Sequence, residues 1–171
     1  TEVAVDGRKW VVKDFSCRSW FVRKLIAPVL ISREIVSIRR LKGISGIAQH
    51  AVRVGPSMLA IEYIEGRSLD KVAPASVTPE FLEKLEALIR KVHDRGVVHL
   101  DLRGGGNIIM RPDGTPGLID FQSGLVTTHI PLAIVKELEA MDMSGAYKKW
   151  LRYQPEAMGE YRREELAREN R

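Results

Sequence analysis

The sequence of 171 residues has one cysteine, few aromatic residues and no long run of apolar residues. Because Cys17 has no second cysteine to pair with, an internal disulfide framework and a cysteine-rich zinc site are both excluded. The most apolar stretch, residues 25–31, is flanked by Arg23, Lys24 and Arg33, and is far shorter than the roughly 18 apolar residues of a membrane span. We therefore expect no transmembrane segment.

Targeting signals and repeats are also lacking. The first ten residues do not show the basic, apolar and small-residue order of a secretory signal, which favours a cytoplasmic protein. What is present is typical of a globular chain: 44% of the residues are hydrophobic and 29% are charged. The net charge of +5 favours anionic partners such as nucleotide phosphates, acidic lipid headgroups or nucleic acid. Nucleic acid is the weakest of these, because the sequence has no helix-turn-helix pattern, aromatic stacking motif or basic stripe.

The order of apolar patterns predicts an α+β fold with two unequal lobes, at residues 1–64 and 65–171. A helical pattern over residues 19–41 is broken at Pro28, and its apolar face leaves Glu34 beside the stripe. Thr78, followed by proline, predicts a helix start. Strands are expected within residues 3–16, 50–54, 58–64, 107–110 and 117–121, and further helices at residues 80–95, 132–141 and 146–153, followed by a solvated or frayed helix at the C-terminal end.

Acidic and amide side chains recur around a glycine run between residues 99 and 122. Asp101 and Asp120 each lie at the end of a short apolar segment, and Asn107 follows Gly104, Gly105 and Gly106. Two carboxylates and an amide oxygen that meet in a cleft would suit Mg²⁺, which prefers oxygen ligands and phosphate. Taken singly, each of these residues is more often an ordinary turn or cap residue.

The order of these residues resembles the protein-kinase-like fold, and in particular small bacterial kinases similar to lipopolysaccharide core (Kdo/heptose) kinases and RIO-type kinases. The motifs that carry the resemblance are HLDLRGGGN with IDFQ, VVKDF, SREIVSIRRL and LAIEYIEGRSL. The resemblance implies a small antiparallel-sheet N-terminal lobe with one main helix, and a reduced, mostly helical C-terminal lobe. ATP and Mg²⁺ are the implied cofactors.

Roles for single residues follow from the same resemblance. Lys13 would hold the α and β phosphates with Glu34 as its ion-pair partner, and Glu62, Tyr63 and Ile64 would form the hinge at the adenine. Asp101 would accept the proton of the attacking hydroxyl, Arg103 would steady the transferred phosphate, and Asn107 with Asp120 would hold Mg²⁺. His99 is expected to be a buried architectural residue.

Several features depart from the family pattern. Asn107 follows Asp101 by one residue more than is usual, and Gln122 stands in the glycine position of Asp-Phe-Gly. No glycine-rich loop or first strand precedes Lys13, so both are expected to be missing, and no Ala-Pro-Glu element follows Phe121. The pattern therefore argues against a regulated activation loop and a peptide-docking platform.

The sequence does not identify the molecule that would accept the phosphate. The resemblance implies a sugar hydroxyl of a membrane glycolipid, with the protein peripheral at the inner face of the membrane. The basic and apolar residues 19–34 could lie against anionic headgroups, although packing of Ile35 and Ile38 into the small lobe explains them more simply. Two alternatives are an atypical serine/threonine kinase acting on protein and a pseudokinase that binds a partner without catalysis.

Overall fold

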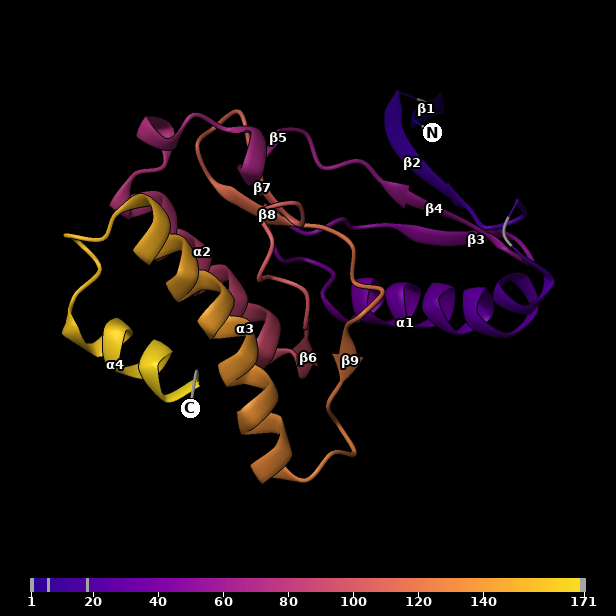
Figure 1. Cartoon of the computed structure of the whole chain (residues 1–171). Coiled ribbons are helices and arrows are strands. Elements are labelled where there is room, and N and C mark those ends of the chain that lie inside the picture. The colour runs from indigo at the N-terminus through magenta and orange to yellow at the C-terminus, as the bar shows by residue number, and fades with distance from the viewer. Residues whose placement is uncertain (1, 6, 18, 170–171) are drawn as a thin grey trace.

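A computed structural model describes residues 2–5, 7–17 and 19–169, arranged as a small sheet lobe beside a mostly helical lobe (Figure 1). The sheet contains β1 (Glu2–Val5), β2 (Arg8–Asp14), β3 (Ala51–Gly55) and β4 (Met58–Glu62) in the antiparallel order β1-β2-β4-β3. Both predicted hairpin pairs are thus confirmed. Gly7 takes a positive φ of 74° in the first turn, and its neighbour Asp6 lies outside the described residues.

One helix covers this sheet. A π-helical turn, η1 (Val22–Ile26), leads into α1 (Ala27–Arg40), and Pro28 lies in the first turn of α1, where its missing N–H is tolerated. The predicted apolar stripe is confirmed, but the placement of Glu34 beside it is wrong. Glu34 is fully buried within the stripe. It can lie there because β2 supplies Lys13 as a partner, which the helical pattern alone did not reveal.

The helical lobe begins with α2 (Pro79–Asp94). The hydroxyl of Thr78 accepts a hydrogen bond from the Phe81 N–H, as a capping residue should, and Gly96 follows the helix with a positive φ of 67°. Leu82, Leu85 and Ile89 form its buried face, so the predicted helix is confirmed.

Short strands frame the loops between the lobes. β5 (Arg67–Ser68), β7 (Ile108–Met110) and β8 (Pro116–Leu118) form one antiparallel sheet, and β6 (Val97–Val98) pairs with β9 (Leu125–Val126). Two 3₁₀ turns, η2 (Leu69–Lys71) and η3 (Pro74–Ser76), precede α2. β8 ends at Leu118, earlier than expected, so Asp120 lies in a loop and not in a strand.

The C-terminal part differs from expectation. The two helices predicted after Pro131 are one continuous helix, α3 (Leu132–Tyr153). Its centre, where a break was expected, is buried against the loop that follows His99: a Cβ on Gly145 would lie 3.0 Å from Leu102. Close packing at this small residue keeps the helix intact. α4 (Glu160–Glu169) follows, anchored by buried Leu166.

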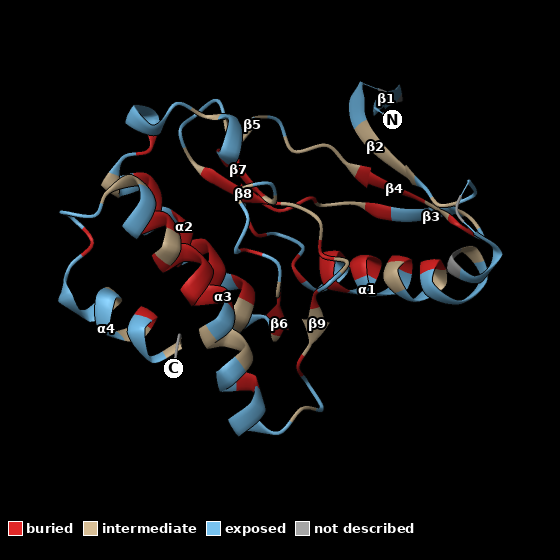
Figure 2. Ribbon diagram, in the orientation of Figure 1, coloured by how far each residue is buried: buried red, intermediate tan, exposed pale blue. Residues whose placement is uncertain are grey.

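Buried residues form one continuous core through both lobes. They run from the inner face of α1 to the facing sides of α2 and α3 (Figure 2). No helix among the described residues is long and apolar enough to cross a bilayer. The α+β class and the small antiparallel sheet with its helical partner lobe agree with the sequence prediction, whereas the exact lobe boundary after residue 64 stays a prediction.

Glu86 on α2 joins the three long helices of the second lobe. Its carboxylate accepts the indole N–H of Trp150 at 2.6 Å and Nε of Arg162 at 2.5 Å, and the Arg162 guanidinium lies 4.2 Å from the centre of the Trp150 ring. Each partner comes from a different helix, because Trp150 lies on α3 and Arg162 on α4.

We expect Glu86→Ala to lower the free energy of unfolding by about 2–4 kcal/mol, because it leaves a buried indole N–H and a guanidinium without their acceptor. Urea denaturation measures the change. Glu83→Ala removes an exposed glutamate of the same helix and should change the value by less than about 0.5 kcal/mol. Equal losses in the two variants would contradict the anchoring role of Glu86.

Candidate functional site

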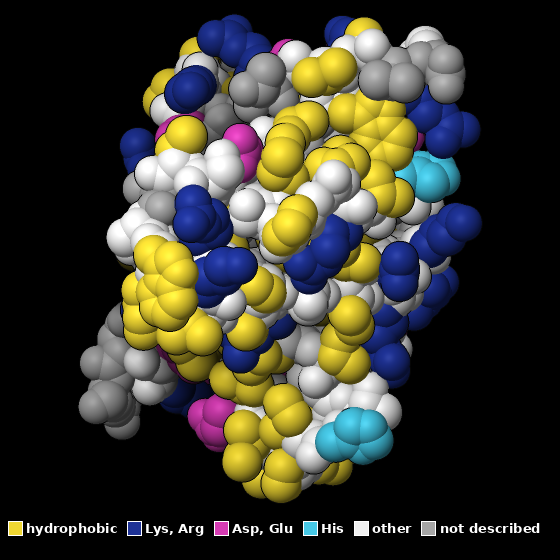
Figure 3. Space-filling model, turned by 90° about the vertical axis from the view of Figure 1, so that its right-hand side faces the viewer, with side chains coloured by type: hydrophobic (Ala, Val, Ile, Leu, Met, Phe, Trp, Pro, Cys, Tyr) yellow, Lys and Arg dark blue, Asp and Glu magenta, His cyan; other side chains and the backbone are white. Residues whose placement is uncertain are grey.

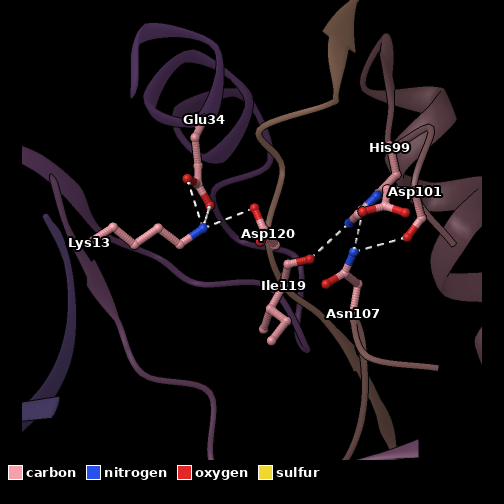
Figure 4. Close-up of polar contacts among 7 residues, drawn as sticks. All are labelled: Lys13, Glu34, His99, Asp101, Asn107, Ile119 and Asp120. Carbon is pink, nitrogen blue, oxygen red and sulfur yellow. Dashed lines mark hydrogen bonds and ion pairs between the residues drawn. The ribbon is translucent and has the colours of Figure 1, made fainter. Parts of the chain in front are cut away.

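Lys13 is the centre of a charged cluster between the lobes. Its Nζ lies 2.9 and 3.0 Å from the two carboxylate oxygens of Glu34 and 2.9 Å from Oδ1 of Asp120 (Figure 4). The three residues come from β2, α1 and the loop after β8. The structure therefore brings together three residues that the sequence separates by up to 107 positions.

Burial and charge oppose each other at Glu34. Burial raises the pKa of its carboxyl group above the usual value, and the nearby charge of Asp120 adds to this effect. The ammonium group of Lys13 acts in the opposite direction through its charge and its hydrogen bonds. Because an isolated buried carboxylate is costly, the ionised form of Glu34 depends on Lys13.

The cluster forms one wall of a largely apolar cavity. The predicted hinge residues Glu62, Tyr63 and Ile64 line this cavity together with Lys13 and Asp120. Its remaining walls are mostly apolar and come from both lobes: Val11, Ile38, Ala48, Ile61, Ile109, Leu118 and Phe121. An apolar slot with charged groups at one end suits a flat ring that carries an anionic tail.

The side chain of Glu62 makes polar contacts of its own. Its carboxylate lies 3.1 Å from Nδ1 of His50 and accepts the Gln49 N–H at 2.9 Å. Burial acts to raise the pKa of Glu62, but the hydrogen bonds from His50 and Gln49, together with nearby positive charge, hold the pKa below its usual value. Glu62 is thus ionised and its side chain is held by the segment before β3, which is compatible with the predicted hinge contact, made to adenine through the main chain.

Asp101 and Asn107 face each other in spite of their unusual spacing. Nδ2 of Asn107 donates to Oδ2 of Asp101 at 2.8 Å and to its carbonyl oxygen at 3.0 Å (Figure 4). The intervening loop packs against η2, where a Cβ on Gly105 would lie 2.9 Å from the Asp70 nitrogen. Glycine is therefore required at this close approach, and the extra residue is accommodated without separating Asp101 from Asn107.

Asn107 and the Asp120 segment are neighbours across the β7–β8 hairpin. The Ile119 N–H donates to the Asn107 carbonyl at 3.0 Å. Nδ2 of Asn107 is engaged by Asp101, and this contact does not use its side-chain oxygen, while the carboxylate of Asp120 is partly exposed. Carboxylate and amide oxygens fit Mg²⁺, which completes its coordination with water and phosphate. Within the described ranges no group of three or more His, Cys, Asp or Glu side chains gathers as a metal site by itself.

Asp142, on α3, is a positioning residue that sequence analysis missed. One carboxylate oxygen accepts the His99 N–H at 2.6 Å and the other accepts the Leu100 N–H at 2.7 Å, while His93 lies 3.1 Å from the first. Leu100 has a positive φ of 64°, which is strained for a leucine. Asp142 thereby holds the main chain in this conformation immediately before Asp101. The sequence offered no signal for this role, because the burial of Asp142 follows only from the packing of α3 against the loop at His99.

His99 braces the loop from the other side, which confirms the prediction that it is a core residue. It is fully buried, its Nε2–H donates to the Ile119 carbonyl at 2.9 Å, and its ring packs on Phe121 with centroids 4.5 Å apart. Burial lowers the pKa of His99, so the ring is neutral and carries its proton on Nε2. Asp120, next to Ile119, also has a positive φ, of 65°.

Arg103 lies apart from the Lys13 cluster. Its exposed guanidinium is 4.0 Å from the Glu169 carboxylate on α4, and its carbonyl oxygen accepts a hydrogen bond from buried Lys149 at 2.5 Å. Burial, together with the charge of Arg152, lowers the pKa of Lys149 to about 8. The predicted contact of Arg103 with a transferred phosphate stays a prediction and would require its side chain to leave Glu169.

The fold and this arrangement are compatible with a small two-lobed kinase-like protein. No family model matches the chain. A stretch of 65 residues, or 37% of the chain, is 35% identical to a serine/threonine-protein kinase D from Synechocystis sp.. The chain spans only 13% of the length of that relative. The comparison therefore supports a kinase-like relationship over part of the chain, and does not extend to lipopolysaccharide kinases.

We expect Lys13→Met to raise the pKa of Glu34 further, because the substitution removes the cation and keeps the burial. Because folding raises the pKa of Glu34, the protein loses stability as the pH rises from the unfolded pKa of about 4.3 through the folded pKa. The variant has the higher folded pKa, so it should lose stability over a wider pH range. Carbon-13 NMR titration of Glu34 gives the pKa. Lys9→Met, on the same strand but exposed, should leave it unchanged; an unchanged pKa in Lys13→Met would show that Lys13 does not support the ionised form.

A second test concerns Asp142. We expect Asp142→Asn to lower the free energy of unfolding by about 2–4 kcal/mol, because an amide offers one acceptor where the carboxylate receives two main-chain N–H groups. Hydrogen exchange should accelerate most at His99 and Leu100. Glu137→Gln, an exposed site on the same helix, should have little effect. Exchange that accelerates evenly along α3 would instead indicate a purely structural role.

Proposed function

We propose that this protein is an ATP- and Mg²⁺-dependent phosphotransferase that transfers the γ-phosphate of ATP to a hydroxyl group. The observation that carries the proposal is the position of the Lys13, Glu34 and Asp120 cluster on the wall of the hinge-lined cavity. This arrangement offers an apolar slot for a base, a cation for phosphates and a carboxylate for a metal ion. The partial similarity to a serine/threonine kinase supports it.

Each residue then has a physical task. Lys13 binds the phosphate oxygens of the nucleotide, and Glu34 holds the ammonium group in place. Asp120 and Asn107 would hold Mg²⁺, which when bound neutralises charge on the phosphates. Asp101 orients the acceptor hydroxyl and takes its proton, while Asn107 keeps the Asp101 carboxylate in position through the hydrogen bond at 2.8 Å. Catalysis in this scheme is mainly positioning and charge neutralisation.

For the acceptor, the motif pattern favours a sugar hydroxyl of a lipopolysaccharide-type glycolipid. A protein serine or threonine is the second candidate, and the partial similarity to a serine/threonine kinase favours it specifically. The two acceptors differ in product: transfer from γ-labelled ATP gives either a labelled lipid that extracts into organic solvent or a labelled protein. A nucleotide-binding protein that labels neither would be a pseudokinase.

Thermal melting with ATP, with Mg²⁺ and with both tests the nucleotide site. We expect the largest shift with both ligands, since a ligand bound only by the folded state at 100 times its Kd adds about 2.7 kcal/mol of stability. Asp120→Ala should lose the Mg²⁺-dependent part of the shift. Asp101→Ala should keep the shift and lose phosphate transfer.

Asp94→Ala, which removes an exposed carboxylate at the end of α2, is the matched control and should keep both properties. No shift with ATP and Mg²⁺ in the unaltered protein would contradict the proposed nucleotide site. Full transfer by Asp101→Ala would contradict the role of Asp101 as the proton acceptor.

A further inference from the structure

An exposed apolar surface lies at the start of α1, at the end of the sheet lobe. The side chains of Trp20, Phe21, Leu25 and Val29 are 64%, 57%, 54% and 51% exposed, and Ile26 adjoins them. We call this surface, together with Arg23, Lys24 and Arg33, the α1 tip. Single exposed apolar residues are ordinary, but five within ten positions, two of them large aromatics, mark an interaction surface.

The core does not need these residues. Ile31, Ile35 and Ile38 already fill the face of α1 that packs on the sheet. The π-helical turn η1 precedes them, and its wider i to i+5 turn shifts the earlier residues out of register with that stripe. Leu25 lies within this turn and its side chain is exposed, whereas Val29 follows the turn and lies on the outer face of α1 at helical spacing with Arg33 and Val36.

The charged residues of the α1 tip are all basic, and the nearest acid before them in the chain is exposed Asp14. Residues 15–33 include four basic residues and no acidic residue. Glu34, the next acid along the chain, is buried and bound to Lys13. Figure 3, which faces this end of the molecule, shows hydrophobic side chains interspersed with Lys and Arg, and few Asp or Glu.

We propose that the α1 tip binds the surface of an anionic lipid bilayer. Trp20, Phe21 and Leu25 would enter the headgroup and upper acyl region, while Arg23 and Lys24 pair with lipid phosphates. The mix of exposed tryptophan, aliphatic and basic residues on one face is the composition that such an interface favours. The proposal concerns binding alone and does not depend on the proposed catalytic activity.

A second copy of this chain fits the α1 tip less well than an anionic bilayer does. A symmetric dimer would place Arg23, Lys24 and Arg33 of one copy against the same basic surface of the other. That contact would desolvate like charges with no acidic side chain of the tip to pair with them. A bilayer containing anionic lipid supplies both the apolar environment and the opposite charge.

The α1 tip is also fixed to the sheet. Arg53 on β3 donates to the Pro28 carbonyl at 3.3 Å and to the Ser32 hydroxyl at 3.1 Å. These bonds hold the first turns of α1 against the strand edge, so the tip presents a preformed surface and requires little ordering on binding.

Flotation with vesicles of phosphatidylcholine and phosphatidylglycerol, compared with phosphatidylcholine alone, tests the proposal. We expect binding to the anionic vesicles only, weakened by added salt. Arg23→Gln with Lys24→Gln should reduce the affinity about 25-fold, since each basic residue near an anionic surface contributes about fivefold. Trp20→Ser with Phe21→Ser should reduce it on the order of tenfold or more.

Two matched control pairs lie elsewhere on the molecule. Lys84→Gln with Lys91→Gln removes the same charge from α2, and Leu132→Ser with Ile134→Ser removes exposed apolar side chains from the start of α3. Both should bind vesicles as the unaltered protein does, with unchanged melting temperatures for every variant. Asp101→Ala should also bind normally, which separates this test from the catalytic one.

Three results would overturn the proposal. The first is absence of binding to anionic vesicles, or equal binding to both vesicle types. The second is an equal loss in a control pair and in the tip variants. The third is a dimer in solution, detected by sedimentation, that Trp20→Ser with Phe21→Ser dissociates, because the occupant of the tip would then be a second copy.

Discussion

The ion pairs of the Lys13 ammonium group fix the relative positions of the sheet, α1 and the loop after β8. Glu34 is fully buried, and a buried carboxylate without a partner would be expelled or protonated. Lys13 reaches it from the neighbouring strand and also contacts Asp120 from the helical lobe. The sheet, α1 and the loop after β8 therefore meet at one nitrogen atom. With two carboxylates around one ammonium group, the cleft retains negative charge that a divalent cation would offset.

The two loops beside this cluster behave as one unit. Leu100 and Asp120 both take positive φ values, and each would relax without support. Asp142 holds the first through main-chain hydrogen bonds, and His99 joins the first loop to the second by its bond to Ile119. The Ile119 N–H in turn binds the Asn107 carbonyl. The main-chain conformation at the site is thus supported by buried groups from α3 and the β7–β8 hairpin.

Local signals were sufficient for most of the fold. The hairpins, the cap at Thr78 and the apolar faces of α1 and α2 follow from turn chemistry and periodicity, which act between near neighbours. The motif order also brought Lys13, Glu34 and Asp120 together correctly. Tertiary contacts decided the rest. Asp142 looks like a solvated helical acid until His99 is folded against it, and the continuity of α3 depends on the fit of Gly145 against Leu102. The placement of Arg103 beside Glu169 has the same origin, since no local pattern links them.

The two faces of α1 differ in function: the inner face packs on the sheet and the outer face is exposed to solvent. Its inner face must be apolar except at Glu34, where the site requires a carboxylate, and Ile31, Ile35 and Ile38 provide that face. Its outer face carries Val29, Arg33 and Val36 at helical spacing, which continues the exposed surface of the tip along the helix. Glu34 is the only acid of the helix, and it is withdrawn from the surface by Lys13. Because Glu34 is buried against Lys13, no acidic side chain of α1 reaches the outer face of the helix.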